Sequence, residues 1–480
     1  MNVKELFADI PVLEMHADPD LEIAAVRYDS RRVTPGDLFI AIRGYATDGH
    51  KYIPSAVEKG AALVVAEEVP PLPVPYILVK DARRTLAMLG AAWYGHPEKS
   101  LRIVGVTGTN GKTTTTTLLK KIIEDCTGDT VGLIGTNQNM IGQTVLEADR
   151  TTPESFELYA LLADMRDAGC RWLVMEVSSH ALYLDRVWGL HFDTAVFTNL
   201  SRDHLDFHKT MENYRDAKAV LFTRCDHAVI NIDDPAGETM LAQGAPHVLT
   251  YSADRNDADL AAKNIRLEPR GVRFEALMEA AICRIQLHIP GKFSVYNALA
   301  AVGCGISLGF SLDKIADSLY DAVGVKGRAE VVPVPADYTV LIDYAHSPDS
   351  MENILRTVRG FCKGRIIGVF GCGGDRDRTK RPIMGRVAGD LCDVALVTSD
   401  NPRSEDPMAI IREILPGLEG AKAQVVTEPD RITAIHKALD MARADDVVLL
   451  MGKGHETYQE INGEKHHMDE REIVAEHFAG

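Results

Sequence analysis

The run Ile103-Val-Gly-Val106, followed by Thr107-Gly-Thr-Asn-Gly-Lys-Thr-Thr114, decides the fold class of this 480-residue chain. The first part has the apolar character of a buried strand, and the second is a glycine-rich turn. Apolar side chains recur at helical spacing between residues 118 and 123, which predicts a helix after the turn. A strand, a glycine-rich turn and a helix in this order are typical of a phosphate-binding α/β domain.

Glycines in the turn would let backbone N–H groups approach phosphate oxygens, and the helix N-terminus would add a partial positive charge. Lys112 would then reach the β- and γ-phosphates, and Thr113 would place its hydroxyl on Mg²⁺. The usual P-loop has glycine where this chain has Val106, flanked here by Gly105 and Gly108, so the loop is a variant. The alternative interpretation is a glycine-rich turn with a chance Lys-Thr pair.

Two further strands end in polar side chains that could serve such a site. The apolar strand Trp172–Glu176 ends in Glu176, which could hold Mg²⁺ directly or through water, or be a buried structural carboxylate. A second apolar strand, residues 194–197, precedes Asn199-Leu-Ser-Arg-Asp-His-Leu-Asp-Phe-His208. A helix cap explains one Asp or Ser of this cluster but not the whole set. The cluster is therefore predicted to be functional, although His208 alone is compatible with a surface position.

Composition places the chain among soluble globular proteins. Hydrophobic residues make up 46% and charged residues 25%, close to the average. No apolar run approaches the roughly 18 residues that span a bilayer, and acids among the first residues leave no apolar signal core. With 69 acidic and 52 basic residues the formal charge is −17, which opposes nucleic acid and anionic membrane as partners. The eight cysteines contain no C-x-x-C pair, which indicates a reducing cytoplasm.

The chain is too long for one hydrophobic core and divides into three predicted α/β domains, at residues 1–98, 99–328 and 329–480. The first ends after a helix predicted at residues 82–94. The last repeats strand, loop and helix, and its apolar strands, such as Val447–Met451, are typical of parallel sheets covered on both faces. We expect a smaller N-terminal α/β domain, a central P-loop ATPase domain with a mostly parallel sheet, and a C-terminal Rossmann-like domain.

Several motifs, spread over the whole chain, resemble those of the Mur ligase family in the same order. They are Val106-Thr-Gly-Thr-Asn-Gly-Lys-Thr-Thr114, Met175-Glu-Val-Ser-Ser-His180, Thr198-Asn-Leu-Ser-Arg-Asp-His-Leu-Asp206, Tyr296-Asn-Ala298, Lys326-Gly-Arg328, Asp343-Tyr-Ala-His-Ser-Pro-Asp349, Phe370-Gly-Cys-Gly-Gly-Asp-Arg-Asp377 and Gly452-Lys-Gly-His-Glu456. The resemblance implies an ATP-dependent amide ligase that uses Mg²⁺ and builds the peptide stem of peptidoglycan.

The segment Asp400-Asn401-Pro402-Arg403 is similar to the pattern of family members that add meso-2,6-diaminopimelate to UDP-N-acetylmuramoyl-L-alanyl-D-glutamate. Diaminopimelate is lysine with a further carboxylate, which a guanidinium can clamp through two hydrogen bonds. The same Arg403 would face the ε-ammonium of lysine unfavourably. The alternative is an ordinary loop arginine beside an Asn-Pro turn. The resemblance also assigns diaminopimelate contacts to Arg376, Gly452 and Glu456, the last of which would take an ammonium group.

The resemblance implies the remaining site residues. The nucleotide contacts would be Gly108, Thr109, Asn110, Gly111, Lys112, Thr113, Thr114, Asn297, Arg328 and Asp343. The muramoyl-dipeptide contacts would be Ser30, Thr151, Thr152, Ser178 and Arg186. The metal-associated residues would be Thr113, Glu176, His204 and Lys218, with Lys218 carried as a carbamate, and the catalytic residues would be Lys112, His204 and Lys218.

The implied reaction has two steps. ATP phosphorylates the terminal D-glutamate carboxylate, and the amine of diaminopimelate then attacks the acyl phosphate to give amide, ADP and phosphate. His204 or a carboxylate could take the proton of the amine, and the sequence does not choose between them. Other readings are the same step with L-lysine, a folylpolyglutamate synthetase, a P-loop ATPase switch without ligase activity, and a small-molecule kinase. No protein partner is implied.

Overall fold

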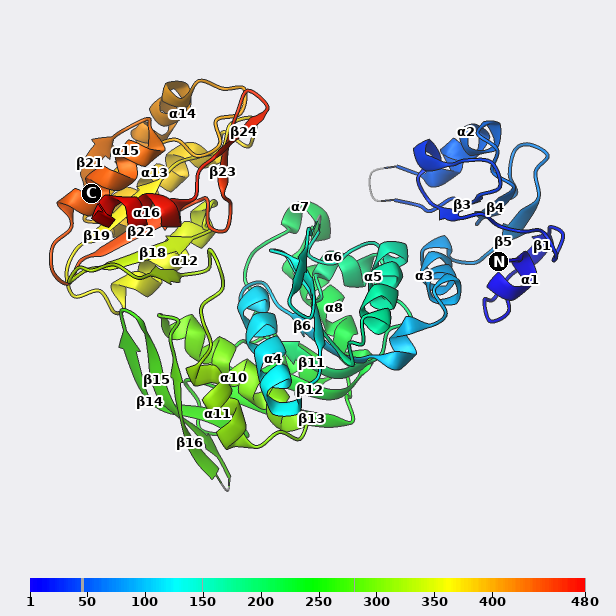
Figure 1. The fold of residues 1–480 in the computed structure, drawn as a ribbon, viewed down its shortest axis with the longest axis horizontal. Helices are drawn as coiled ribbons and strands as arrows, with labels where there is room; N and C mark the ends of the chain where they lie inside the picture. The colour runs from blue at the N-terminus through cyan, green and yellow to red at the C-terminus, as the bar shows by residue number, and fades with distance from the viewer. Residues whose placement is uncertain (45–46, 149, 280, 480) are drawn as a thin grey trace. The chain divides into compact units, whose positions relative to one another are not determined.

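The computed structural model describes residues 1–44, 47–148, 150–279 and 281–479. Contacts divide the chain into two compact units, the first made of Met1–Thr250 and Ser307–Gly309 and the second of Tyr251–Ile306 and Phe310–Gly480. Both units are built from sheets and covering helices (Figure 1), which confirms the predicted α/β class. The three domain boundaries stay a prediction.

The first unit begins with a five-stranded sheet. Its order is β1 (Glu14–His16), β5 (Tyr76–Leu78), β4 (Leu63–Ala66), β3 (Leu38–Ile40) and β2 (Val26–Arg27), all parallel except β1. Its helices are α1 (Val3–Leu6), α2 (Ile53–Glu58) and α3 (Ala82–Trp93). Helix α3 begins where the Asp81 side chain accepts a hydrogen bond from the backbone N–H of Arg84, which satisfies a helix-end donor. The helix predicted at residues 82–94 is therefore confirmed.

The first unit continues with a second sheet that contains the predicted strand Ile103–Val106. After β13 (His247–Ser252), its order is β12 (Cys225–Asn231), β11 (Phe192–Phe197), β6 (Arg102–Thr107), β10 (Trp172–Glu176), β7 (Val131–Ile134), β8 (Asn139–Ile141) and β9 (Thr144–Leu146). The strands from β12 to β7 are parallel, and β8 and β9 are antiparallel additions. The helices are α4 (Lys112–Thr127), α5 (Ser155–Asp167), α6 (Ser179–Tyr183), α7 (Leu205–His208), α8 (Met211–Ala219) and α9 (Gly237–Leu241). The mostly parallel sheet predicted here is confirmed.

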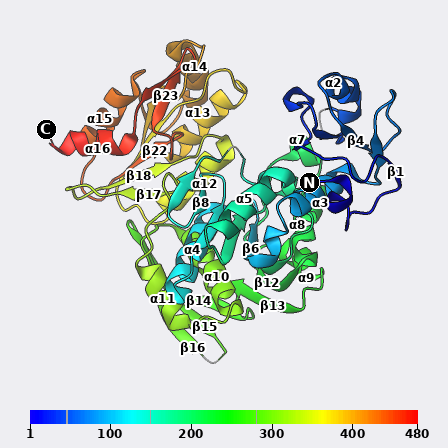
Figure 2. The ribbon, with the colours of Figure 1, turned by 45° about the vertical axis from the view of Figure 1, so that its right-hand side comes forward.

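The second unit opens with an antiparallel ladder of β14 (Leu260–Glu268), β15 (Gly271–Met278) and β16 (Ala281–Leu287), which Figure 2 shows beside helix α11. The last residues of β13 (His247–Ser252) pair with β14 in parallel. Helices α10 (Lys292–Ser307) and α11 (Leu312–Tyr320) follow. The sequence did not predict this ladder.

The main sheet of the second unit carries the Rossmann-like pattern that the sequence predicts. Its order is β17 (Glu330–Val332), β18 (Thr339–Asp343), β22 (Val447–Met451), β19 (Ile366–Phe370), β20 (Val394–Val397) and β21 (Gln424–Thr427), with only β17 antiparallel. Alternate strand residues enter two cores, one under α12 (Pro348–Arg359), α13 (Lys380–Leu391) and α14 (Pro407–Ile414), the other under α15 (Arg431–Met441) and α16 (Glu470–Ala479). A sheet covered on both faces explains its continuous apolar strands.

A hairpin of β23 (Tyr458–Ile461) and β24 (Glu464–His467) follows β22. Among the described residues, no helix is both long and apolar enough to cross a bilayer.

Candidate functional site

The predicted phosphate loop lies between β6 and α4. Gly108 (φ +150°) and Gly111 (φ +86°) adopt backbone conformations that favour glycine. A Cβ atom on Gly108 would lie 1.9 Å from the hydroxyl oxygen of Thr198, so a side chain cannot fit there. Lys112 Nζ donates to the carbonyl oxygens of Gly108 (3.0 Å) and Thr109 (2.9 Å). The loop backbone and the Lys112 ammonium therefore lie together at the N-terminus of a 16-residue helix.

The segment after β11 braces this loop. Thr109 N–H donates to the Asn199 carbonyl oxygen (2.8 Å), and Asn110 N–H donates to the Asn199 side-chain oxygen (2.9 Å). The Thr198 hydroxyl donates to the Asn110 carbonyl oxygen (2.7 Å). Part of the polar cluster that begins at Asn199 thus holds the backbone of Thr109 and Asn110 in place.

Lys218, on α8, is almost fully buried beside the same loop. Its Nζ donates to the Gly108 carbonyl oxygen at 2.8 Å. Burial and the positive charge of Lys112 hold the pKa of Lys218 well below its usual value of 10.5, with the Asp203 carboxylate opposing. A lysine in this setting favours the neutral amine, which has a nucleophilic lone pair that an ammonium lacks.

Glu176 ends β10 with its carboxylate buried, as the sequence predicts. One carboxylate oxygen accepts from the Thr136 N–H and the other from the Thr136 hydroxyl, both at 2.9 Å. The Thr136 hydroxyl also lies 3.0 Å from the Thr151 hydroxyl. Each carboxylate oxygen keeps a second lone pair, so the group is oriented without being saturated.

Four predicted dipeptide contacts gather beside Glu176, and one of them, Thr151, reaches it through Thr136. The Thr152 hydroxyl donates to the Glu176 carbonyl oxygen (2.8 Å), and it accepts from the Ser178 N–H (3.1 Å). Arg186 Nη1 donates to the Thr152 carbonyl oxygen (3.2 Å). The structure therefore brings together Thr151, Thr152, Ser178 and Arg186, four of the five residues predicted for this substrate.

The fifth, Ser30, lies in a short 3-10 helix, Ser30–Arg32, beside the first sheet. Its carbonyl oxygen accepts from Lys59 Nζ (3.1 Å). Within the part of the chain that the structure describes, no hydrogen bond or ion pair joins Ser30 to the Thr151 group.

His204 lies in an aromatic cluster with His180, Phe207 and His208. The His204 side chain is half-exposed, its backbone is left-handed (φ +53°), and its ring centroid is 4.9 Å from that of His180. His208 is buried and bonds the Ser179 hydroxyl (2.9 Å), which corrects the surface position considered above. Burial lowers the pKa of His208 to about 4, so its ring packs as a neutral side chain.

In the second unit, β18 ends at Asp343. Its carboxylate oxygens accept from the backbone N–H groups of Ala329 (2.8 Å) and Ala345 (2.9 Å), and desolvation raises the pKa of the group. The Arg328 guanidinium lies 5.4 Å from the Tyr344 ring centroid, so Arg328 and Asp343 flank one turn. Asn297 is buried on α10.

The Asp400–Arg403 loop follows β20 and packs on the loop after β19. Asn401 and Pro402 approach Gly374 so closely that a Cβ atom there would lie 1.9 Å from the Pro402 carbonyl oxygen. Arg403 (φ +50°) donates from Nη1 to the Gly374 carbonyl oxygen (2.9 Å) and from Nε to Glu460 (3.1 Å). A Cβ on Gly373 would lie 3.0 Å from Arg403 Nη1 and 3.8 Å from Arg376 Cγ, so the two arginines flank Gly373.

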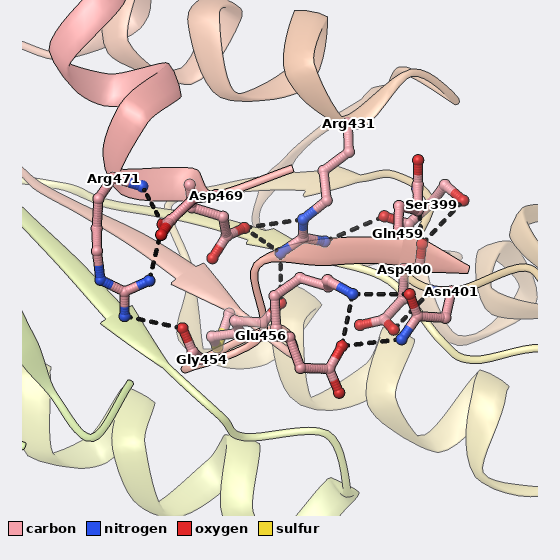
Figure 3. A network of polar contacts seen from close by, with 12 residues as sticks. Ser399, Asp400, Asn401, Arg431, Gly454, Glu456, Gln459, Asp469 and Arg471 are labelled. Carbon is pink, nitrogen blue, oxygen red and sulfur yellow. Dashed lines mark hydrogen bonds and ion pairs between the residues drawn. The ribbon is translucent and has the colours of Figure 1, made fainter. Parts of the chain in front are cut away.

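The loop after β22 completes this group. A Cβ atom on Gly452 would lie 2.5 Å from an Asp400 carboxylate oxygen. The Asn401 Nδ2 group donates to Glu456 Oε2 (2.9 Å), as Figure 3 shows. All seven residues predicted to contact diaminopimelate therefore lie in three neighbouring strand-end loops, where ligands of parallel sheets bind. They are Arg376, Asp400, Asn401, Pro402, Arg403, Gly452 and Glu456.

Three stretches of the chain match domains of known proteins. Residues 22–94 match the Mur ligase family catalytic domain, residues 106–305 the Mur ligase middle domain, and residues 327–454 the Mur ligase glutamate ligase domain. These matches cover most of the chain, and the fold and the phosphate loop agree with them. The chain belongs to the Mur ligase family.

The chain is also similar to individual ligases over nearly its whole length. The chain is 48% identical to a UDP-N-acetylmuramoyl-L-alanyl-D-glutamate–2,6-diaminopimelate ligase of Clostridium botulinum, over 95% of each chain. It is 44% identical to the ligase of the same name of Geobacillus thermodenitrificans, over 99% and 98%. A solved structure of such a ligase has a TM-score of 0.75 at 32% identity, covering 100% of this chain and 99% of that one. A MurF ligase of Thermotoga maritima in complex with ADP shares the fold (TM-score 0.61, 20% identity, 96% and 98% covered).

Several residues of the site escaped the sequence analysis. Thr136 orients Glu176, and Gln459 and Glu460 of the β23–β24 hairpin contact the Asp400–Arg403 loop. Thr136 belongs to no recognisable sequence motif. Nothing in the sequence around Gln459 and Glu460 distinguishes them from solvent-exposed polar residues. Only their contacts reveal them.

The site loops of the second unit rest on a fully buried ion pair. Arg431 bonds Glu470 (2.7 Å) and donates to the carbonyl oxygens of Ser399 (3.1 Å) and Met451 (2.9 Å), where β20 and β22 end. Figure 3 shows Arg431 and its contact with Ser399. We expect Glu470→Ala to destabilise the chain by about 3–5 kcal/mol, because it leaves a buried guanidinium uncompensated. Denaturant unfolding followed by circular dichroism measures this.

The matched control is Glu472→Ala on the same helix. Glu472 is 59% exposed and pairs with His467, so its loss is expected to change stability by less than about 0.5 kcal/mol. Equal shifts in the two variants would contradict the role of the buried pair.

Proposed function

We propose that the chain is the ATP-dependent amide ligase that joins meso-2,6-diaminopimelate to UDP-N-acetylmuramoyl-L-alanyl-D-glutamate, in the cytoplasmic synthesis of peptidoglycan precursors. The full-length relatives of that name support the reaction. The single observation that carries the choice of amino acid is the setting of Arg403. Its Nε and Nη1 are held by Glu460 and Gly374, and no described residue bonds its Nη2, so this end of the guanidinium can clamp a carboxylate.

ATP is proposed to bind with its phosphates on the loop Gly108–Thr114, and to contact Asn297, Arg328 and Asp343 through the rest of the nucleotide. The ADP complex of the Thermotoga maritima relative supports nucleotide binding by this fold. The loop N–H groups, the N-terminus of α4 and Lys112 supply positive charge where the triphosphate would lie.

Mg²⁺ would be held by Thr113, Glu176, His204 and a carbamate on Lys218, and it would neutralise charge between the phosphates and the attacking carboxylate. The described residues contain no cluster of three or more His, Cys, Asp or Glu that could hold a metal by themselves. That suits Mg²⁺, which uses one or two carboxylates together with substrate phosphates and water. Glu176, oriented and unsaturated, fits such a role.

The buried state of Lys218 supports the proposed carbamate. A neutral amine can attack carbon dioxide to give a carbamate and a proton, whereas an ammonium cannot. Burial favours the neutral amine of Lys218, and the product would replace a buried amine by an anion next to Lys112. An anionic oxygen ligand for the metal would then stand beside the phosphate loop.

The chain's own residues position the reactants for both steps. Thr151, Thr152, Ser178 and Arg186 would orient the dipeptide, with Ser30 on the uridine nucleotide. The D-glutamate carboxylate of the dipeptide would attack the γ-phosphate of ATP and release ADP. Lys112 would offset the repulsion between the negatively charged carboxylate and triphosphate. The amine of diaminopimelate then attacks the acyl phosphate, and phosphate leaves as the amide forms. His204 would act here as metal ligand or proton acceptor.

Phosphate release with ATP, Mg²⁺ and the UDP-muramoyl dipeptide tests the function. We expect turnover with meso-diaminopimelate and little with L-lysine or without amine, because only diaminopimelate offers the second carboxylate. Turnover with L-lysine instead would contradict the choice of amino acid, and release that ignores both co-substrates would indicate an ATPase without ligase activity.

Arg403→Met tests the specificity. Losing the clamp on a substrate carboxylate is expected to raise the KM for diaminopimelate about 100-fold and to leave the KM for ATP unchanged. The matched control is Arg412→Met, which removes an exposed arginine of α14. An unchanged KM for diaminopimelate in Arg403→Met would exclude the clamp.

Lys218→Ala tests the carbamate. Loss of an anionic ligand at the phosphate site is expected to lower kcat by about 100-fold or more, and a small carboxylic acid such as acetate is expected to restore part of the rate. Full activity in the variant, or a loss that no carboxylic acid relieves, would speak against it.

A further inference from the structure

Lys453, between Gly452 and Gly454 in the loop after β22, has a fully buried side chain. Its ammonium donates to Asn401 Oδ1 (2.7 Å) and to Glu456 Oε2 (2.6 Å). A buried ammonium is costly unless it is paired and hydrogen-bonded. This one is paired with two side chains that are both proposed to contact diaminopimelate.

The ammonium fixes the orientation of the Asn401 amide. A lysine can only donate, so the oxygen Oδ1 must face it, and the backbone N–H of Glu460 donates to the same oxygen (2.9 Å). The nitrogen Nδ2 therefore points the other way, where it donates to Glu456 Oε2. No described residue bonds the second N–H of this amide group, which leaves it for a substrate.

The same contacts fix the Glu456 carboxylate. Both donors, Lys453 Nζ and Asn401 Nδ2, reach the oxygen Oε2. The lone pairs of Oε1 are then available to an incoming ammonium group. The charge of Glu456 is balanced by Lys453, so the pair offers a directed acceptor rather than an isolated buried charge.

We propose that Lys453 is a positioning residue for the amino-acid substrate. It sets the Asn401 amide and the Glu456 carboxylate so that one N–H and one carboxylate oxygen face the carboxylate and ammonium of the amino acid. This inference rests on the proposed function, because it deepens the diaminopimelate site.

Lys453→Met in the full-length chain tests it by phosphate release. We expect the KM for meso-diaminopimelate to rise about tenfold or more, as for the loss of charge-assisted hydrogen bonds. The KM values for ATP and for the UDP-muramoyl dipeptide should change less than about twofold, since those substrates do not depend on this pair. Equal rises in all three KM values would show that Lys453 only holds the loop together.

A double-mutant cycle with Glu456→Gln separates positioning from general destabilisation. Because Lys453 acts through both Asn401 and Glu456, Lys453→Met should raise the KM for diaminopimelate by a smaller factor in the Glu456→Gln background than in the wild type. If the fold-changes in the KM for diaminopimelate of the two single variants simply multiply in the double variant, the proposal is overturned. If Lys453→Met does not fold, Lys453→Gln takes its place in the cycle with the same expected outcomes.

Arg365→Met is the matched control. Arg365 is a partly buried cation of the same sheet, paired with Asp446 (2.7 Å) at the start of β19, away from the strand-end loops. It should leave the KM for diaminopimelate unchanged. If the wild-type chain shows no turnover with diaminopimelate, the proposed function itself is overturned. If the wild-type chain turns over normally and Lys453→Met leaves the KM for diaminopimelate unaltered, only the role of Lys453 is overturned.

Discussion

Backbone crowding at the carboxyl ends of parallel strands is the constraint on which both site regions depend. Parallel pairing brings these ends to one edge of each sheet, and the loops that leave them must pass close together. The contacts are so short that side chains are excluded: a Cβ on Gly371 would lie 2.4 Å from the Thr398 carbonyl oxygen, and one on Gly108 1.9 Å from the Thr198 hydroxyl. Glycine at these positions lets neighbouring loops pack against one another. The polar side chains on these loops are therefore held in defined positions.

This constraint also separates what the sequence could predict from what it could not. β10 and β22 match their predicted bounds because each is a continuous apolar run covered on both faces. The β14–β16 ladder was missed because its strands mix exposed and buried residues, and the β23–β24 hairpin because its strands contain no buried residue. Both depend on pairing between segments. The motif residues were found where they are contiguous. The burial of Lys453 was not, because nothing local distinguishes it from a solvated lysine between two glycines.

Two fully buried lysines, Lys218 and Lys453, show how neighbouring groups decide what one residue type can do. Lys218 meets a backbone carbonyl oxygen and the charge of Lys112, a setting that disfavours a second cation. Lys453 meets an amide oxygen and a carboxylate, which compensate a cation. The first setting suits covalent chemistry on nitrogen, and the second suits the alignment of hydrogen bonds. Burial alone does not distinguish them; the partners do.

The left-handed backbone of Arg403 opposes stability to the role in substrate choice that we propose for its side chain. A non-glycine residue in this conformation costs on the order of 1–3 kcal/mol, and here it is held by Arg403 N–H to the Glu460 carbonyl oxygen (3.0 Å) and Asn462 N–H to the Arg403 carbonyl oxygen (2.8 Å). Glycine would relax the backbone but remove the guanidinium. Selection for stability and selection for the proposed substrate specificity therefore act in opposite directions at position 403.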